Sequence, residues 1–149
     1  MQEHIQNELA SFIANCDWEK IAPHFKEDAA YRVLDWIGCA VAGEHYPQVE
    51  IAQKYFIENG DQGNSTVIGH QTKCSPRTAA FLNGIAGHVC ELDDGHRTAI
   101  GHPGSIAVPT ALALGEHPNA SGADVLKAVI LGHYSFSRLG RTVNPSHYR

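Results

Sequence analysis

The chain has 149 residues, a length that suits one domain with a sizeable core. Hydrophobic residues make up 43% and charged residues 18%, which excludes a disordered chain and a general nucleic-acid binder. The formal net charge of −5 gives no overall attraction for phosphates or acidic membranes, so an acidic substrate would need a local basic pocket.

Several features of the sequence are typical of a cytoplasmic protein. The N-terminus lacks the basic start and apolar run of a signal peptide, and no apolar stretch approaches the roughly 20 residues that span a bilayer. The four cysteines show no CxxC spacing and are interpreted as reduced core residues. We therefore expect a cytoplasmic location with no membrane or nucleic-acid partner.

Apolar residues at helical spacing predict helices in the first part of the chain. The first series runs from Ile5 to Cys16 and the second, a broad stripe, from Ala29 to Val41. Pro23 separates them, because proline is tolerated only at the first turn of a helix. A third helix is expected from Pro47 to the Asn59-Gly60 pair.

The helical spacing of apolar residues ends after the third predicted helix. Residues 64–69 are short and β-branched between glycines, which favours a minor strand or an extended turn. Ser75 and Pro76 then form an N-cap and a first helical position, and that helix runs to Val89.

Two more helices are predicted in the C-terminal part. One covers 104–116 and is rich in alanine and leucine; the other starts at Ser121, where Asp124 gives capping-box spacing. Asn144-Pro145 breaks it. The sum is five or six helices with at most one short extended segment, which predicts an all-α domain of packed helices.

The loop from Glu91 to Gly101, between the helices 75–90 and 104–116, is dense in charge and has no period. It offers carboxylates, histidines that exchange protons near neutral pH, and an arginine that can hold a carboxylate: Glu91, Asp93, Asp94, His96, Arg97 and, just beyond it, His102. His102 lies directly before a helix start whose free N–H groups favour an anion. An acidic substrate with an α-proton could thus be bound and deprotonated here.

Two other interpretations stay open. A charged loop between helices is often only a solvated loop, and His88 is interpreted as a packed, hydrogen-bonded histidine. Asp93, His96 and His102 could instead supply three ligands to the metal of a hydrolase, although their spacing matches no HExxH or cysteine–histidine signature.

Several segments resemble one family. They are Ala79–His88, Glu91–Arg97, His102–Ser105 with Pro109–Glu116, and more weakly Arg32–Asp35 with Gly38 and Gly122–Leu126. Together they are similar to the N-terminal part of the helical domain in the MmgE/PrpD (2-methylcitrate dehydratase-like) family. The resemblance covers most of the chain.

The resemblance implies a cofactor-independent and metal-free lyase, a hydro-lyase such as 2-methylcitrate dehydratase, that acts on small di- or tricarboxylic acids by proton abstraction next to a carboxylate. An epimerase or decarboxylase of the same family is an alternative. Members are commonly dimeric. We expect His102 to transfer the proton with Asp93 and His96, and Glu91, Asp94, Arg97, Gly104 and Ser105 to contact the substrate.

The chain departs from the family pattern in its loop. Glu91 stands where decarboxylase-like members carry Asp, Gly95 stands where they carry Thr, and the loop is one residue longer before His102. These changes argue against cis-aconitate decarboxylation. In the last helix, Gly132-His133-Tyr134-Ser135 replaces an expected Gly-Tyr-Glu motif.

Family members are much longer and add a smaller α/β lid domain. We therefore expect residues 1–149 to form only the N-terminal part of the helical domain, without the lid, as a fragment, a truncated product or half of a split enzyme. On this view the chain alone lacks a complete active site. An inactive helical module that self-associates through exposed apolar surface is the non-enzymatic alternative.

Overall fold

The computed structural model describes residues 2–146, which form helices joined by turns and loops. The elements are α1 (Gln2–Ala14), the short 3-10 helix η1 (Trp18–Lys20), α2 (Pro23–Gly43), α3 (Pro47–Glu58), α4 (Pro76–His88), α5 (Gly104–Gly115) and α6 (Gly122–Val143). Within these residues there is no strand, only two isolated bridges, Ser65 with Cys74 and His96 with Gly101. The predicted all-α class is confirmed, and residues 64–69 form an extended turn.

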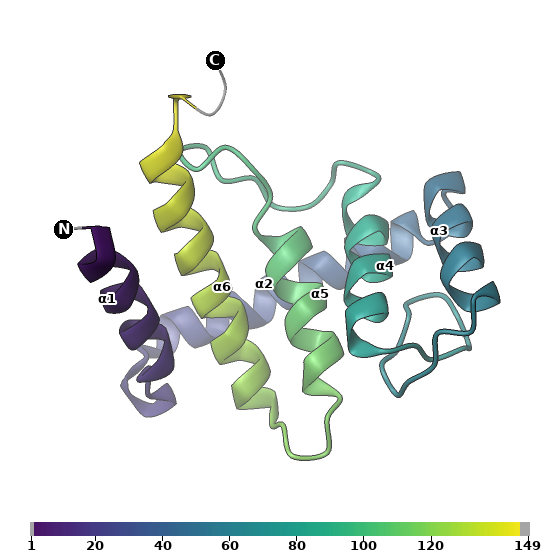
Figure 1. The fold of residues 1–149 in the computed structure, drawn as a ribbon, viewed down its shortest axis with the longest axis horizontal. Helices are drawn as coiled ribbons and strands as arrows, with labels where there is room; N and C mark the ends of the chain where they lie inside the picture. Colours follow the sequence, from purple (N-terminus) through teal and green to yellow (C-terminus); the bar gives the residue numbers. More distant parts are fainter. Residues whose placement is uncertain (1, 147–149) are drawn as a thin grey trace.

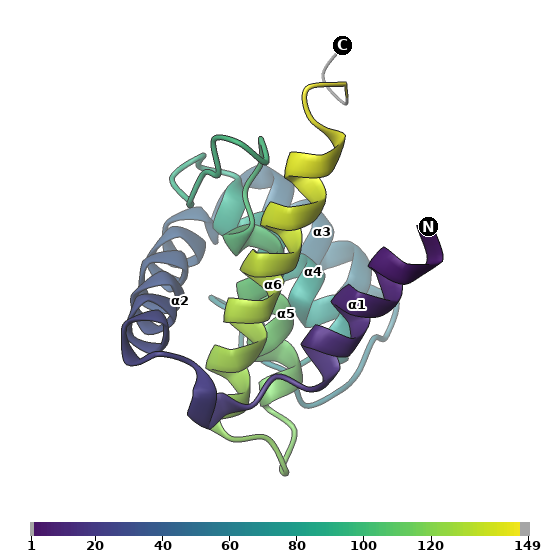
Figure 2. The same ribbon diagram turned by 90° about the vertical axis from the view of Figure 1, so that its left-hand side faces the viewer.

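Helices α6, α5 and α4 stand side by side, and α2 crosses behind all three (Figure 1). The view turned by 90° shows α2 on one side of this layer and α1 next to α6 (Figure 2). Helix α3 packs on α4. The ring centroids of Phe12 in α1 and Tyr134 in α6 lie 4.9 Å apart. None of the described helices is both long and apolar enough to cross a membrane.

Four of the helices begin at residues that favour a helix start, either a proline at the first helical position or a capping box. Pro23, Pro47 and Pro76 each occupy the first helical position, where the missing N–H costs nothing. The Ser121 hydroxyl accepts from the Asp124 N–H, and the Asp124 carboxylate accepts from the Ser121 N–H, so the predicted capping box is present in full.

Small residues let α2 and α4 cross closely. A Cβ added to Gly87 of α4 would lie 2.5 Å from Nε1 of Trp36, whose ring is only 2% exposed. A Cβ on Gly43 of α2 would collide with the carbonyl of Ala86. This contact fixes the last turn of α4, the turn that carries His88.

A proline brings α4 and α5 together. Pro109 lies inside α5 and has no N–H, so it cannot donate to the Ser105 carbonyl one turn earlier. Gly84 of α4 faces that carbonyl, and a Cβ there would lie 3.1 Å from its oxygen. The two helices on either side of the predicted site are therefore held at a fixed, short separation.

Candidate active site

The loop from 89 to 103 leaves α4, runs over the C-terminal half of α6 and returns to α5 (Figure 1). The His96 N–H donates to the Gly101 carbonyl at 2.8 Å, and the Ile100 N–H donates to the His96 carbonyl at 2.7 Å. Glu91 and Ile100 adopt left-handed backbone, with φ of 55° and 51°. Such a conformation costs a non-glycine residue about 1–2 kcal/mol, and strain of this kind gathers at functional sites.

Helix α6 anchors the loop. The Asn144 side chain donates to the Ala99 carbonyl at 2.7 Å. Two glycines allow close contact, since a Cβ on Gly140 would lie 2.5 Å from the Ala99 Cβ and one on Gly101 would lie 2.7 Å from the Phe136 ring. The loop is thus tied to α6 as well as to the two helices that it connects.

At the centre of the loop, the Asp93 side chain is fully buried between two histidines. Nδ1 of His88 lies 3.0 Å from Oδ1 of Asp93 and 3.2 Å from its Oδ2. Nδ1 of His102 lies 3.4 Å from the same Oδ1. We call His88, Glu91, Asp93 and His102 the Asp93 cluster.

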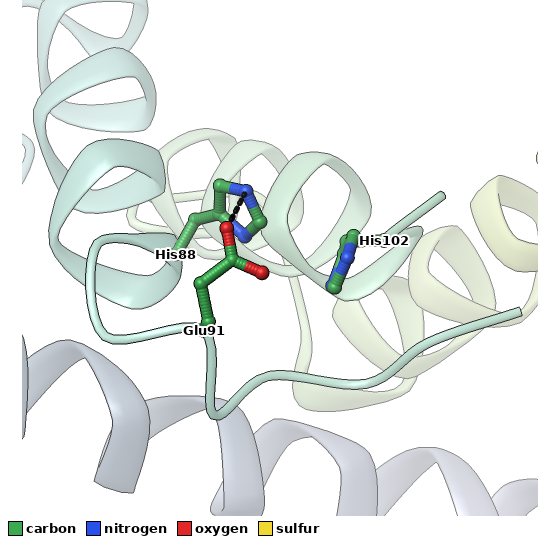
Figure 3. Close-up of side chains that lie close together, drawn as sticks. All are labelled: His88, Glu91 and His102. Carbon is green, nitrogen blue, oxygen red and sulfur yellow. Dashed lines mark ion pairs between the residues drawn. The ribbon is translucent and has the colours of Figure 1, made fainter. Parts of the chain in front are cut away.

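The two imidazoles of the Asp93 cluster face each other edge to face, with centroids 4.6 Å apart and planes at 60°. Nε2 of His88 lies 3.8 Å from Oε1 of Glu91, the ion pair drawn in Figure 3. The side chains of His88 and His102 are 41% and 33% exposed. Asp93 therefore holds the inner nitrogens of two rings whose outer parts reach the surface.

Nδ1 of His102 is buried and lacks a hydrogen-bond partner among the described residues. Its 3.4 Å separation from Asp93 is an ion-pair distance, but the angle does not make a hydrogen bond. An unpartnered buried donor costs about 1–3 kcal/mol.

Asp94 points away from this cluster and accepts three donors. These are the Gly104 N–H at 2.8 Å, Nη1 of Arg32 at 3.2 Å and Nε2 of His133 at 3.0 Å. Burial by itself would raise the pKa of Asp94, but the hydrogen bonds from His133 and Gly104, with the charge of Arg32, hold that pKa below its ordinary value. Asp94 thus joins α2, α5 and α6 through one carboxylate.

Both ring nitrogens of His133 face oxygen acceptors. Nδ1 lies 2.9 Å from the Val129 carbonyl, and Nε2 lies 3.0 Å from Asp94. His133 therefore links the backbone of its own helix to Asp94. His133 belongs to the segment that departs from the family's Gly-Tyr-Glu motif.

The structure brings three of the predicted site residues, Glu91, Asp93 and His102, into the Asp93 cluster. Ser105 lies close by, because its hydroxyl donates to the His102 carbonyl at 2.9 Å. Ser105 and His88 also line a groove of about 510 Å³ between α4 and α5.

The other predicted residues lie elsewhere. The Gly104 N–H, expected to bind a substrate anion, already donates to Asp94. Nδ1 of His96 accepts from the Ala99 N–H at 3.1 Å, and His96 lines a separate groove of about 980 Å³ next to α1, α2 and α6. Arg97 is exposed and forms no ion pair with another described residue.

Sequence reasoning assigned no site role to His88, Arg32 or His133. The signal for His88 was local, since a histidine in the last turn of a helix lies near a carboxylate five residues later. Arg32 and His133 come from positions 62 and 39 residues away from Asp94, and no spacing rule reports such pairs.

The described residues offer one group suited to a metal ion. Ligand atoms of His88, Glu91 and His102 lie within 4.8 Å of one another. The set considered from the sequence, Asp93, His96 and His102, is not brought together, because His96 turns toward its own loop backbone.

Comparisons with known proteins identify the family of the chain. Residues 7–149 match the MmgE/PrpD N-terminal domain. The chain is 30% identical to a cis-aconitate decarboxylase-like protein of Aspergillus oryzae over 92% of its own length and 30% of that protein. It is 31% identical to a cis-aconitate decarboxylase of Aspergillus terreus over 93% of its length and 29% of that protein. It is 33% identical to the cis-aconitate decarboxylase of Homo sapiens over 67% of its length and 22% of that protein.

The chain therefore spans less than a third of the length of these curated relatives. Its match to the family covers almost every described residue, from α1 to the end of α6. The chain belongs to the MmgE/PrpD family, with residues 7–149 matching the N-terminal domain of that family.

Proposed function

We propose that this domain supplies the proton-transferring part of a lyase site for small di- or tricarboxylic acids. The observation that carries the proposal is the buried Asp93 carboxylate shared by His88 and His102. A carboxylate on the inner nitrogen of an imidazole fixes its tautomer and stabilises the imidazolium formed when the ring takes a proton.

In this proposal Nε2 of His102 removes a proton from the carbon next to a substrate carboxylate. The hydrogen left on Nδ1 then strengthens its contact with Asp93, which lies 3.4 Å away and lacks good geometry in the resting state. His88 already has a 3.0 Å hydrogen bond to Asp93 and orients the carboxylate between the rings. Asp93 is thus a positioning residue for His102.

The carboxylates of the substrate require cationic partners. Within the described residues, neither the Asp93 cluster nor the groove beside His88 includes a lysine or arginine. The first amide of α5 is also taken by Asp94. Arg97 and segments outside this chain are therefore proposed to hold the substrate carboxylates.

The substrate is proposed at the level of a class. The relatives' names make cis-aconitate the first acid to test, whereas Glu91 and Gly95 depart from the decarboxylase-like pattern and favour a hydroxy acid such as 2-methylcitrate. Loss of water removes a proton from carbon and expels hydroxide, which leaves as water once it is protonated. Loss of CO₂ breaks a carbon–carbon bond, and the carbon that lost CO₂ takes up a proton. A group that removes a proton in the first reaction can deliver one in the second, so His102 could serve either reaction.

The test is a turnover assay on a panel of citrate-like acids. The chain is assayed alone and together with a polypeptide that supplies the rest of the relatives' length. In an active preparation, His102→Ala should lower kcat by about 100-fold or more, the usual contribution of general acid–base catalysis. Asp93→Asn should lower kcat with little change in KM.

His117→Ala is the matched control, because His117 is exposed in the turn between α5 and α6. It should leave kcat unchanged. An active preparation in which His102→Ala keeps full kcat would remove the proposed role of His102. An active His102→Ala together with a strongly impaired His88→Ala would move the role to His88.

A second candidate function is assembly. Several large apolar side chains point outward from α2 and α3: Tyr31, Leu34, Val41, Ile51 and Tyr55, each more than half exposed. Such a surface favours association with another helix layer. Light scattering should show a dimer that Leu34→Glu dissociates, and a monomer at all concentrations would contradict self-association.

A further inference from the structure

We infer that the Asp93 cluster binds one zinc ion through Nε2 of His88, Nε2 of His102 and the carboxylate of Glu91. One ring nitrogen of each histidine and a carboxylate oxygen of Glu91 lie within 4.8 Å of one another, and Figure 3 shows the three side chains close together. This site does not depend on the proposed lyase activity, because it requires only the geometry of the chain itself.

The donor set suits zinc. Zinc accepts imidazole nitrogen and carboxylate oxygen at about 2.0–2.2 Å and often keeps an open position for water when three protein ligands are present. Ligand atoms around such an ion lie closer together than 4.8 Å, so one side chain must move inward. Glu91 can do so, since its side chain is 74% exposed and is held among the described residues only by the 3.8 Å ion pair with His88.

The buried Asp93 carboxylate is what separates this group from a chance cluster of surface histidines. It lies 3.0 Å from Nδ1 of His88 and 3.4 Å from Nδ1 of His102. Zinc-binding histidines usually donate their other N–H to a carboxylate, which fixes the ring and makes the metal-binding nitrogen more basic. One buried carboxylate here serves both rings and leaves both Nε2 atoms for the ion.

The site also predicts an effect on chemistry. If His102 transfers a proton through Nε2, an ion on that nitrogen blocks the transfer, so zinc and the substrate compete for the same atom. Zinc would therefore act as an inhibitor of the site and would be removed by a chelator.

Isothermal titration of the chelator-treated chain with Zn²⁺ measures the site directly. We expect one ion per chain. His88→Ala and His102→Ala should each weaken binding at least about tenfold, and Asp93→Asn should weaken it about 10- to 100-fold, the usual loss when a supporting carboxylate is removed. Glu91→Gln tests the third ligand at an exposed position where folding is not at risk.

His117→Ala and His96→Ala are the controls and should bind zinc as the parent chain does. No Zn²⁺ binding, or unchanged affinity in His88→Ala or His102→Ala, overturns the proposal. A larger loss in His96→Ala than in His88→Ala also overturns it and favours the ligand set considered from the sequence.

A histidine variant that fails to fold does not prevent a decision. In the parent chain, NMR spectra of the ten imidazoles report which nitrogens bind the ion. Zinc-induced shifts at Nε2 of His88 and His102 support the site. Shifts confined to other histidines overturn it.

Discussion

Asp93 and Asp94 are neighbours in the sequence but face opposite sides of the same loop. Asp94 accepts donors from α2, α5 and α6, and its pKa is held below the ordinary value by those contacts in spite of its burial. The Asp93 side chain is fully buried, and its hydrogen-bond and ion-pair partners among the described residues are the imidazoles of His88 and His102, the second without hydrogen-bond geometry.

This difference separates the two tasks of the loop. The donors of Asp94 come from three helices, so Asp94 is suited to hold these helices together. A carboxylate beside two rings that can each take a proton responds to every proton transfer, so Asp93 is suited to support chemistry. Stability and reactivity thus depend on adjacent residues that can be changed one at a time.

Removing Asp94 should have the largest effect on stability. Asp94→Ala leaves Arg32, His133 and the Gly104 N–H without their acceptor, and should lower the free energy of unfolding by about 2–4 kcal/mol. Asp28→Ala is the control, because Asp28 pairs with the same Arg32 at 2.6 Å on the exposed side. It should cost less than about 1 kcal/mol in denaturant unfolding. Equal losses in the two variants would contradict the structural role of Asp94.

The close contact between α2 and α4 next to His88 should have the second largest effect on stability. Gly87→Ala forces a methyl group against the buried Trp36 ring and should lower the free energy of unfolding by about 1–3 kcal/mol. Gly38→Ala is the matched change in the exposed part of α2, where a Cβ meets nothing within 4 Å. It should stabilise the helix by about 0.5–1 kcal/mol. A neutral Gly87→Ala would mean that α2 and α4 separate easily.

The smallest effect should be on how the free energy of unfolding changes at acidic pH. The pKa of Asp94 in the folded chain lies below its ordinary value of 3.8, so the stability that its charge contributes is fully present above about pH 4. It is lost as the pH falls through the lower, folded-state pKa. Unfolding of the parent and of Asp94→Asn between pH 2 and 6 should therefore differ in slope, by at most about 1.4 kcal/mol per pH unit.

Other carboxylates with lowered pKa, among them Asp61 and Glu116, titrate in the same range. The parent and Asp94→Asn both contain these carboxylates, so their contribution to the pH dependence of unfolding cancels when the two proteins are compared. If the free energy of unfolding changed with pH in the same way in the parent and in Asp94→Asn, the assignment of the lowered pKa to Asp94 would be contradicted.

The helices were predictable because their signals are local. Pro47, Ser75 and Ser121 mark helix starts, and the apolar period after each mark predicts the helix that begins there. The loop was also predicted as a loop. Residues 64–69 were the uncertain segment, and their single bridge from Ser65 to Cys74 depends on tertiary contacts such as the Ser65 hydroxyl on the Ala113 carbonyl.

The site was only partly predictable, because sequence spacing does not say which way a loop side chain points. The charged residues from Glu91 to His102 were found, but their division into two groups was not. Arg32 and His133 reach Asp94 from distant helices, and the same carboxylate occupies the Gly104 N–H that was expected to bind substrate. His88 was interpreted from the sequence as a packed, hydrogen-bonded histidine. Its hydrogen bond to Asp93 makes it a member of the Asp93 cluster.

Glu91 has a consequence for how this domain could evolve or be engineered. Its left-handed backbone is one that glycine adopts freely, so Glu91→Gly would relieve about 1–2 kcal/mol of strain and raise thermal tolerance. The same change deletes the carboxylate beside His88. A screen of variants for heat resistance alone would thus favour loss of this carboxylate, so such a screen needs a second readout of the Asp93 cluster.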